Sequence, residues 1–206
     1  MAAKLSVLFR STQIAFDEVS RELGRLQALS VLAEVGKRNA QGAPFKSCPP
    51  PADERERDTR AELVPAVNLY DVLRERIDEE RAYQVARRVI LNSSLLHLRS
   101  IYPDFKGRNF LGLAQGDAGR AEARLGADFA FADTRVIEMT PEKASFDVVH
   151  CRIPATLGMV GASRLASIFC EVDFIYFPIF EPEVKLERQQ TLIHGGKVCD
   201  FRFSWK

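Results

Sequence analysis

The chain has 206 residues, of which 46% are hydrophobic and 28% are charged. This length suits one domain with a sizeable core, and the composition is that of an ordinary globular protein, which excludes disordered, collagen-like and coiled-coil chains. Its 29 Lys and Arg residues nearly balance its 28 Asp and Glu residues, which leaves a net charge of +1. Such a balance excludes the broad positive surface that holds phosphate backbones or anionic lipid, so we expect no nucleic-acid partner.

Uncharged apolar stretches in the chain are short. The stretch 174–180 is among the longest, far below the roughly 20 residues that a bilayer requires, so we expect no membrane partner. Arg10 and Gln13 interrupt the apolar start of the chain, which therefore lacks an export signal, and we expect a cytoplasmic protein. The chain has four cysteines: Cys48, Cys151, Cys170 and Cys199. Because cytoplasmic reductants keep thiols reduced, we expect free thiols rather than disulfides.

The first predicted element is an amphipathic helix over residues 5–35. Its apolar residues recur every three or four positions, as at Phe16, Val19 and Leu23, with charged residues between them. This helix forms an N-terminal arm, residues 1–38. The pattern favours packing of the arm against the rest of the chain, and a homodimer contact through the helix stays open.

A linker and a second helical region follow the arm. Residues 39–60 combine the prolines 49–51 with the charged run 53–58, a mixture that predicts a mobile linker. Helical spacing returns over 62–100, with a break near Asp78, where the charged residues resemble a new first turn. We therefore expect an α+β body over 61–206, in which catalysis or ligand binding takes place.

The C-terminal half of the chain changes character. Glycines interrupt residues 107–126, so we expect loops and short helices there. Alternating apolar residues then predict strands over 129–131, 135–139, 145–153, 184–193 and 198–203. Gly195 and Gly196 predict a hairpin turn between the last two strands, and residues 161–170 favour a short helix. The sum is an α+β fold, in which a helical N-terminal half packs on an antiparallel β-sheet with one crossover helix.

Three cysteines stand beside groups that could act together with a thiol. They occur in the sequences His150-Cys151-Arg152, Cys170-Glu-Val-Asp173 and Cys199-Asp200. Neighbours on a strand point to opposite faces, which weakens a direct dyad of His150 and Cys151. The spacings lack the paired ligands of a zinc site, so we expect no metal and no cofactor, and a metal-dependent enzyme with Cys, His and Asp ligands stays open as a third reading. Buried thiols without chemistry remain an alternative, since free cysteine often behaves as a small apolar residue.

The C-terminal motifs occur in a characteristic order. They are Cys170-Glu-Val-Asp173, Arg188-Gln-Gln-Thr191-Leu, Gly195-Gly196 and Cys199-Asp200-Phe201-Arg202-Phe203. With Cys151 on an upstream strand, this order resembles the L-2-amino-thiazoline-4-carboxylic acid hydrolase family. The resemblance is close over the strand-rich C-terminal part and extends to the helical half only in general layout.

The resemblance implies an enzyme that hydrolyses a small molecule. The expected reaction opens a cyclic amidine or thiazoline ring at a C–N or C–S bond to give an N-carbamoyl amino acid, and recruitment to a biosynthetic pathway stays open. It implies Asp173 as the base or orienter. It further implies Cys170 or Cys199 as the nucleophile, or as the thiol that lines the reacting carbon.

Five further residues are candidates for substrate binding. Arg188 or Arg202 would pair with a substrate carboxylate through the planar guanidinium group. Asp200 would contact the substrate or hold one of these arginines. His150 and Cys151, from the upstream strand, complete the set.

Two other functions stay open. The tail is rich in aromatic residues, namely Phe169, Phe174, Tyr176, Phe177, Phe180, Phe201 and Phe203. Such residues would suit a non-catalytic binder of a hydrophobic small molecule. A ring-forming or isomerising enzyme on the same fold is the other alternative, because folds outlast substrate specificity.

Overall fold

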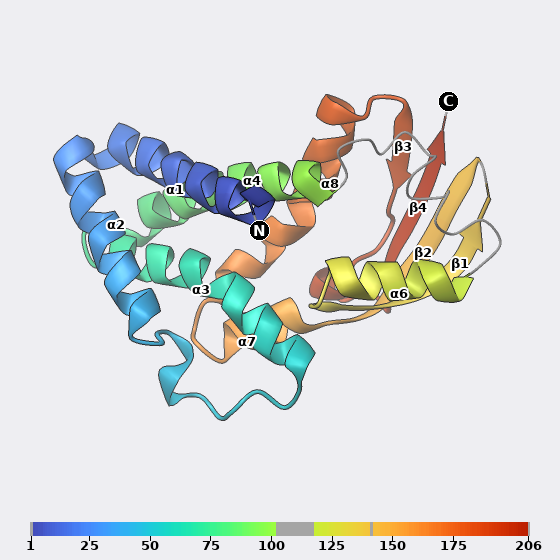
Figure 1. The fold of residues 1–206 in the computed structure, drawn as a ribbon, viewed down its shortest axis with the longest axis horizontal. Coiled ribbons are helices and arrows are strands. Elements are labelled where there is room, and N and C mark those ends of the chain that lie inside the picture. Colours follow the sequence, from blue (N-terminus) through green and yellow to red (C-terminus); the bar gives the residue numbers. More distant parts are fainter. Residues whose placement is uncertain (1, 102–117, 141, 206) are drawn as a thin grey trace.

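The computed structural model describes residues 2–101, 118–140 and 142–205 (Figure 1). The α-helices of this part are α1 (Ala2–Leu23), α2 (Arg25–Ala40), α3 (Glu54–Arg74), α4 (Glu79–Ile101), α6 (Ala118–Asp128), α7 (Arg152–Gly158) and α8 (Ala166–Phe180). The strands are β1 (Ala132–Met139), β2 (Lys143–Cys151), β3 (Val184–Glu187) and β4 (Cys199–Trp205). They form one antiparallel sheet in the order β1-β2-β4-β3. The predicted α+β fold, with its helices N-terminal and its sheet C-terminal, is confirmed.

The N-terminal arm consists of two helices instead of the single helix expected over 5–35. α1 ends at Leu23 and α2 starts at Arg25, and the chain turns sharply at Gly24 (Figure 1). Gly24 has a φ of 82°, a backbone conformation that other residues rarely adopt. Glu18 on α1 is buried and accepts a hydrogen bond from Arg88 on α4 (3.0 Å), which fastens the arm to the helical body. Contact with a second copy stays a prediction.

The segment expected as a linker contains the start of a helix. α3 begins at Glu54, earlier than the predicted start at Glu62, and the Asp53 side chain accepts a hydrogen bond from the backbone N–H of Glu56 at its N-terminus (2.7 Å). Arg60 is only 6% exposed and donates to the carbonyl of Pro49 (2.7 Å). This bond ties the proline-rich stretch to α3. The break predicted near Asp78 is confirmed, since α3 ends at Arg74 and α4 begins at Glu79.

The loop that joins β3 to β4 differs from the predicted hairpin turn. The two strands are antiparallel neighbours as expected, but β3 ends at Glu187, so residues 188–198 form the connection. This loop contains a short 3-10 helix (Leu192–His194) and Gly195 at a φ of 83°. A Cβ atom at Gly196 would lie 2.9 Å from the carbonyl oxygen of Thr191, so the loop folds closely on itself there. Residues 129–131 lie before β1 and are not a strand.

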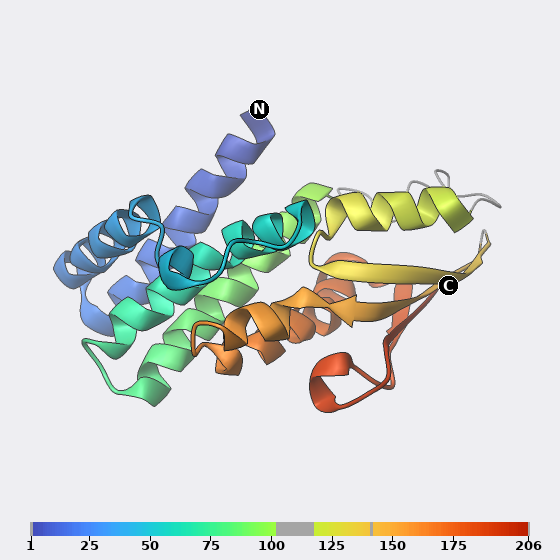
Figure 2. The same ribbon diagram turned by 90° about the horizontal axis from the view of Figure 1, so that it is seen from below.

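The crossover from β2 to β3 carries α7 and α8, and α8 is longer than the helix expected over 161–170. It starts at Ala166 and continues to Phe180, so residues 174–180 belong to the helix. Figure 2 shows α6 running alongside β1, and Leu125 of α6 shares the core above the sheet with Tyr176 and Phe177 of α8. Most of the glycine-rich stretch 107–126 lies outside the described residues. Its last residues, from Ala118 on, form the first part of α6.

Two hydrophobic cores meet along α8. Ile168 and Val172 belong to the core of the helical half, whereas Tyr176 and Phe177 belong to the core above the sheet. One helix therefore contributes to both cores, and the space between them is the place where a ligand can be enclosed. Within the described ranges, no helix has the length and apolar character needed to span a membrane.

Candidate functional site

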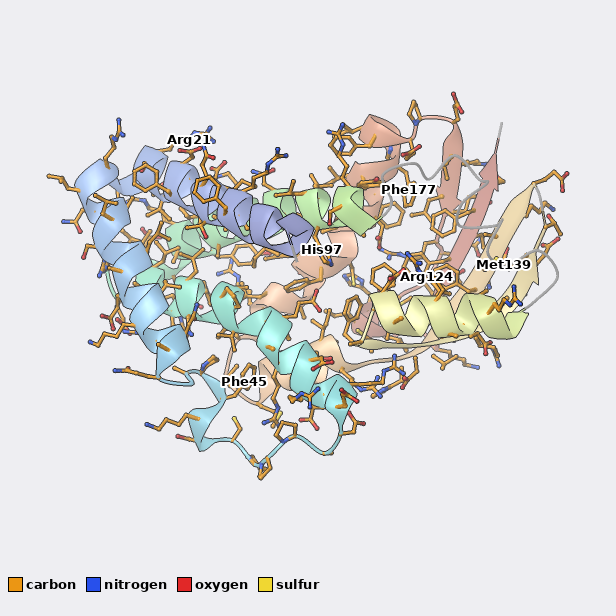
Figure 3. All side chains as sticks on the ribbon, viewed as in Figure 1. Arg21, Phe45, His97, Arg124, Met139 and Phe177 are labelled. Carbon is orange, nitrogen blue, oxygen red and sulfur yellow. The ribbon has the colours of Figure 1, made fainter. Side chains whose placement is uncertain are left out.

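A cavity of about 160 Å³ lies between the two cores. Its walls come from one face of the sheet, from α3, α4, α6, α7 and α8, and from the loop 188–198. The lining is mostly aromatic and aliphatic. Figure 3 labels two lining residues, His97 of α4 and Phe177 of α8, in the region between the helices and the sheet. The site is therefore an apolar pocket with a small number of polar groups, as is usual for small-molecule sites.

The two-residue period of the strands decides which side chains reach the cavity. On β4, Cys199, Phe201 and Phe203 line it, so the alternate residues Asp200 and Arg202 belong to the opposite face of the sheet. We call the first face the inner face and the second the outer face. The predicted site residues of β4 are thereby divided between the two faces.

Arg188 and Asp173 form an ion pair in the wall of the cavity. The Arg188 Nη1 atom donates to the Asp173 Oδ2 atom (2.8 Å), and Nη2 donates to the backbone carbonyl of Cys170. The Arg188 side chain is only 2% exposed, and its guanidinium group lies over the rings of Phe174 (4.5 Å) and Phe201 (4.9 Å). Its buried Nε atom has no hydrogen-bond partner within the described ranges. Arg188 thus holds Asp173 and keeps N–H groups available for a ligand.

Burial changes the protonation of Asp173. It raises the pKa of this carboxyl group from its ordinary 3.8 to about 6, although the Arg188 guanidinium group acts in the opposite direction. The side chain remains 22% exposed. Both the ionised and the protonated form are therefore accessible near neutral pH, as is required of a group that takes up and returns a proton.

Three thiols, Cys151, Cys170 and Cys199, line the same cavity. Cys170 lies three residues before Asp173 on α8, a spacing that places both side chains on one helix face. Burial raises the pKa of Cys170 to about 12, and it also raises the pKa values of Cys151 and Cys199. The Cys199 Sγ atom accepts a hydrogen bond from the backbone N–H of Leu192 (3.3 Å). These groups are neutral thiols at ordinary pH, and a neutral thiol is a poor nucleophile.

Asp200 and Arg202 stand on the outer face and do not line the cavity. The Asp200 Oδ1 atom accepts hydrogen bonds from the backbone N–H groups of Gln189 (3.0 Å) and Gln190 (2.8 Å), directly after Arg188. Arg202 donates to the carboxylate of Asp147 (2.7 Å). Asp200 thus fixes the loop that carries Arg188, whereas Arg202 binds within the sheet.

His150 also lies away from the cavity lining. Its Nδ1 atom is 3.1 Å from the Asp133 Oδ2 atom, on the outer face of β1 and β2. Of the eight predicted site residues, the structure brings together Cys151, Cys170, Asp173, Arg188 and Cys199. It does not bring His150, Asp200 or Arg202 to them.

Sequence reasoning missed two ionisable lining residues on the N-terminal helices. Glu62 comes from α3 and His97 from α4, where Ser94, His97 and Leu98 share one helix face. Burial raises the pKa of Glu62. In the sequence, only the helical spacing of Ser94, His97 and Leu98 indicated that these residues share a face. Glu62 is distant in sequence from every C-terminal motif, so no pattern linked it to the site. Across the ranges that the structure describes, no group of three or more His, Cys, Asp or Glu residues is arranged to hold a metal ion.

Comparison with family models gives a match over most of the chain. A family model described as L-2-amino-thiazoline-4-carboxylic acid hydrolase matches residues 56–203, a range that contains every residue of the cavity lining. No curated protein and no solved structure shows significant similarity to the chain. The match extends the resemblance from the strand-rich tail to α3 and α4, and it spans more than half of the sequence. The chain therefore belongs to the L-2-amino-thiazoline-4-carboxylic acid hydrolase family.

Proposed function

We propose that the protein is a hydrolase that opens a small cyclic amidine of the thiazoline type. Membership of the family supports a hydrolase function at the family level. The observation that carries the proposal is the carboxyl group of Asp173, whose pKa is raised to about 6 and which Arg188 holds in the wall of an apolar cavity. Such a group is suited to proton transfer at neutral pH.

In the proposed reaction, Asp173 takes one proton from a water molecule while the water oxygen bonds to the imine carbon of the ring. The electrons of the carbon–nitrogen double bond move to nitrogen, which takes the second proton of the water. The C–S or C–N bond then breaks as the added oxygen forms a C=O bond. The Asp173 carboxyl group delivers the first proton to the leaving sulfur or nitrogen, so one water is consumed and the carboxylate is restored.

Arg188 has two roles in the proposed reaction. Its bond to Asp173 fixes the direction of the carboxylate, and its unpaired Nε–H is available to a substrate carboxylate. Cys170 and Cys199 act as neutral thiols that line the reacting carbon, because burial disfavours the thiolate that nucleophilic attack requires. Asp200 acts through the position of the loop after Arg188.

A second candidate function is non-catalytic binding of a hydrophobic small molecule. The observation in its favour is the lining itself, in which aromatic side chains such as Phe129, Phe169 and Phe177 outnumber the polar groups. Binding alone would not need a carboxyl group with a raised pKa beside an arginine, and for this reason we place hydrolysis first.

The two functions are separated by incubating the purified protein with 2-amino-2-thiazoline-4-carboxylate in water labelled with heavy oxygen. We expect ring opening and one labelled oxygen atom in the carbamoyl product, measured by mass spectrometry. Hydantoins and lactams serve as alternative cyclic substrates in the same assay. If none of these rings is opened while apolar ligands raise the melting temperature, the protein is a binder and the hydrolase proposal fails.

A further inference from the structure

Glu62 is a second carboxylate in the cavity, and the reaction proposed above does not use it. It lies near the middle of α3, on a different element from Asp173 and Arg188. Its side chain reaches solvent, yet it belongs to the lining of the same cavity. Within the described residues it forms no hydrogen bond and no ion pair.

This lack of a partner sets Glu62 apart from other acids near the helical core. Glu18 binds Arg88 (3.0 Å), and Glu56, two turns before Glu62 on α3, binds Arg60. In those pairs an arginine of the protein compensates the carboxylate. At Glu62 the surrounding protein raises the pKa by desolvation alone, so a cation or an N–H donor from a ligand would stabilise the ionised form.

The guanidinium group of Arg188 lies on a different wall element of the cavity from Glu62. Arg188 is bound to Asp173 and to the backbone of α8, so its position is fixed on the C-terminal side of the fold. The cavity therefore offers donors at Arg188 and an uncompensated acceptor at Glu62. A ligand that satisfies both needs an acidic group and a basic group on one small ring.

We propose that Glu62 is a specificity-determining residue that accepts hydrogen bonds from the protonated amidine or amino group of the substrate. Arg188 binds the acidic end of the same molecule, so the cavity selects rings that carry both charges over rings that carry one. The identity of the ring rests on the proposed hydrolase function. Recognition of the basic group at Glu62 does not depend on turnover.

The test measures binding of two probe ligands that each carry one of these groups. They are 2-amino-2-thiazoline, which has the basic group alone, and thiazole-4-carboxylate, which has the acidic group alone. Binding is followed by titration calorimetry to the wild-type protein and to Glu62→Gln, at one pH so that the ionisation of His97, also in the lining, stays constant. The matched control is Glu54→Gln on the same helix, where Glu54 is exposed and pairs with Arg57 (2.9 Å).

We expect Glu62→Gln to weaken binding of 2-amino-2-thiazoline by about tenfold or more, as for loss of a hydrogen bond to a charged group. Binding of thiazole-4-carboxylate should change less than about twofold, as for a carboxylate site elsewhere in the cavity. Glu54→Gln should alter neither. The proposal is overturned if the wild type does not bind the amino ligand, or if Glu62→Gln weakens both ligands equally or neither. Failure of the hydrolase proposal would instead appear as selective binding without ring opening.

Discussion

Two arginine–aspartate pairs lie on opposite sides of the sheet, one between α8 and the loop 188–198 on the inner side and one on the outer face, and the two pairs behave differently. On the inner side, Arg188 and Asp173 are 2.8 Å apart, and on the outer face Arg202 and Asp147 are 2.7 Å apart. Burial raises the pKa of Asp173 to about 6 in spite of its arginine. Burial also acts on Asp147, but hydrogen bonds from Arg202 and Arg135 lower its pKa below the ordinary value.

Contact distance alone therefore does not determine the protonation of a carboxyl group. Asp147 has two arginines, one of which is largely exposed, whereas Asp173 has one arginine and an apolar surrounding. At Asp147 the hydrogen bonds and charges of Arg202 and Arg135 outweigh desolvation, whereas at Asp173 desolvation outweighs the effect of Arg188. The same residue types thus make a structural pair that is charged at neutral pH on the outer face and a group suited to proton transfer on the inner side.

The largest expected effect comes from removing the inner carboxylate. Asp173→Asn should lower the rate of ring opening by at least about 100-fold, the usual contribution of a general base. The matched control is Glu171→Gln on the same helix, since Glu171 also binds an arginine, Arg87, but does not line the cavity. Activity is measured by product formation. Equal losses in the two variants would show that Asp173 has no special part in the reaction.

Exchanging arginine for lysine compares the two pairs directly. Arg188→Lys keeps the charge but loses the planar fork that binds both Asp173 and the Cys170 carbonyl, so we expect kcat/KM to fall by about 100-fold. Arg202→Lys should leave kcat/KM within about threefold because its contacts lie on the outer face. If Arg202→Lys lowers kcat/KM as much as Arg188→Lys does, Arg202 takes part in substrate binding after all.

The two aspartates should give pH dependences of stability with opposite signs. Between about pH 4 and pH 6 the unfolded chain loses the Asp173 proton before the native protein does, so Asp173 lowers the free energy of unfolding as pH rises, by about 2 kcal/mol. The lowered pKa of Asp147 acts in the other direction, because its stabilisation is lost as pH falls through the native pKa.

Urea denaturation between pH 4 and pH 7 measures this difference. The free energy of unfolding of Asp173→Asn, relative to the wild type, should increase with pH over this range. For Asp147→Asn, a second series below pH 4 should show this relative free energy falling as pH rises, and above pH 4 it should stay level. Parallel curves for the wild type and Asp173→Asn would contradict a raised pKa at this position.

Thiol reactivity distinguishes the interior of the site from the rest of the chain. The sequence motifs suggested a reactive Cys170 or Cys199, but burial raises the pKa values of both. With iodoacetamide at neutral pH we expect Cys48, which lies outside the cavity, to react about ten times faster than the cavity thiols. Peptide mapping follows the order of labelling. Rapid labelling of Cys170 that parallels loss of activity would support the nucleophile role instead.

The sequence could predict the parts of the site that depend on a regular period. Cys170 and Asp173 are three residues apart on a helix, and Cys199, Phe201 and Phe203 alternate on a strand, so each group shares one face. The same alternation places Asp200 and Arg202 on the opposite face. Assigning Cys199, Asp200 and Arg202 to one site overlooked this period, which was present in the sequence.

Other features depended on contacts that no period reveals. Arg188 reaches α8 only because the loop 188–198 replaces the expected tight hairpin, and Glu62 joins the cavity through the packing of α3. The early start of α3 did have a local signal. Asp53 and Glu56 have the spacing of a helix N-terminus, and Asp53 does cap the helix, but the adjacent prolines suggested an irregular segment.

The smallest expected effect concerns the second arginine of the outer pair. The Arg135 side chain is 62% exposed and lies 3.1 Å from Asp147, which keeps Arg202 as a closer partner. Arg135→Gln should therefore change the free energy of unfolding at neutral pH by less than about 1 kcal/mol, as for other exposed ion pairs, and leave ring opening unchanged. It should nevertheless raise the pKa of Asp147 towards the behaviour of Asp173, because one of the two lowering cations is gone. NMR titration of the Asp147 carboxyl carbon measures this shift, and an unchanged pKa would show that the number of arginines is not what separates the two faces.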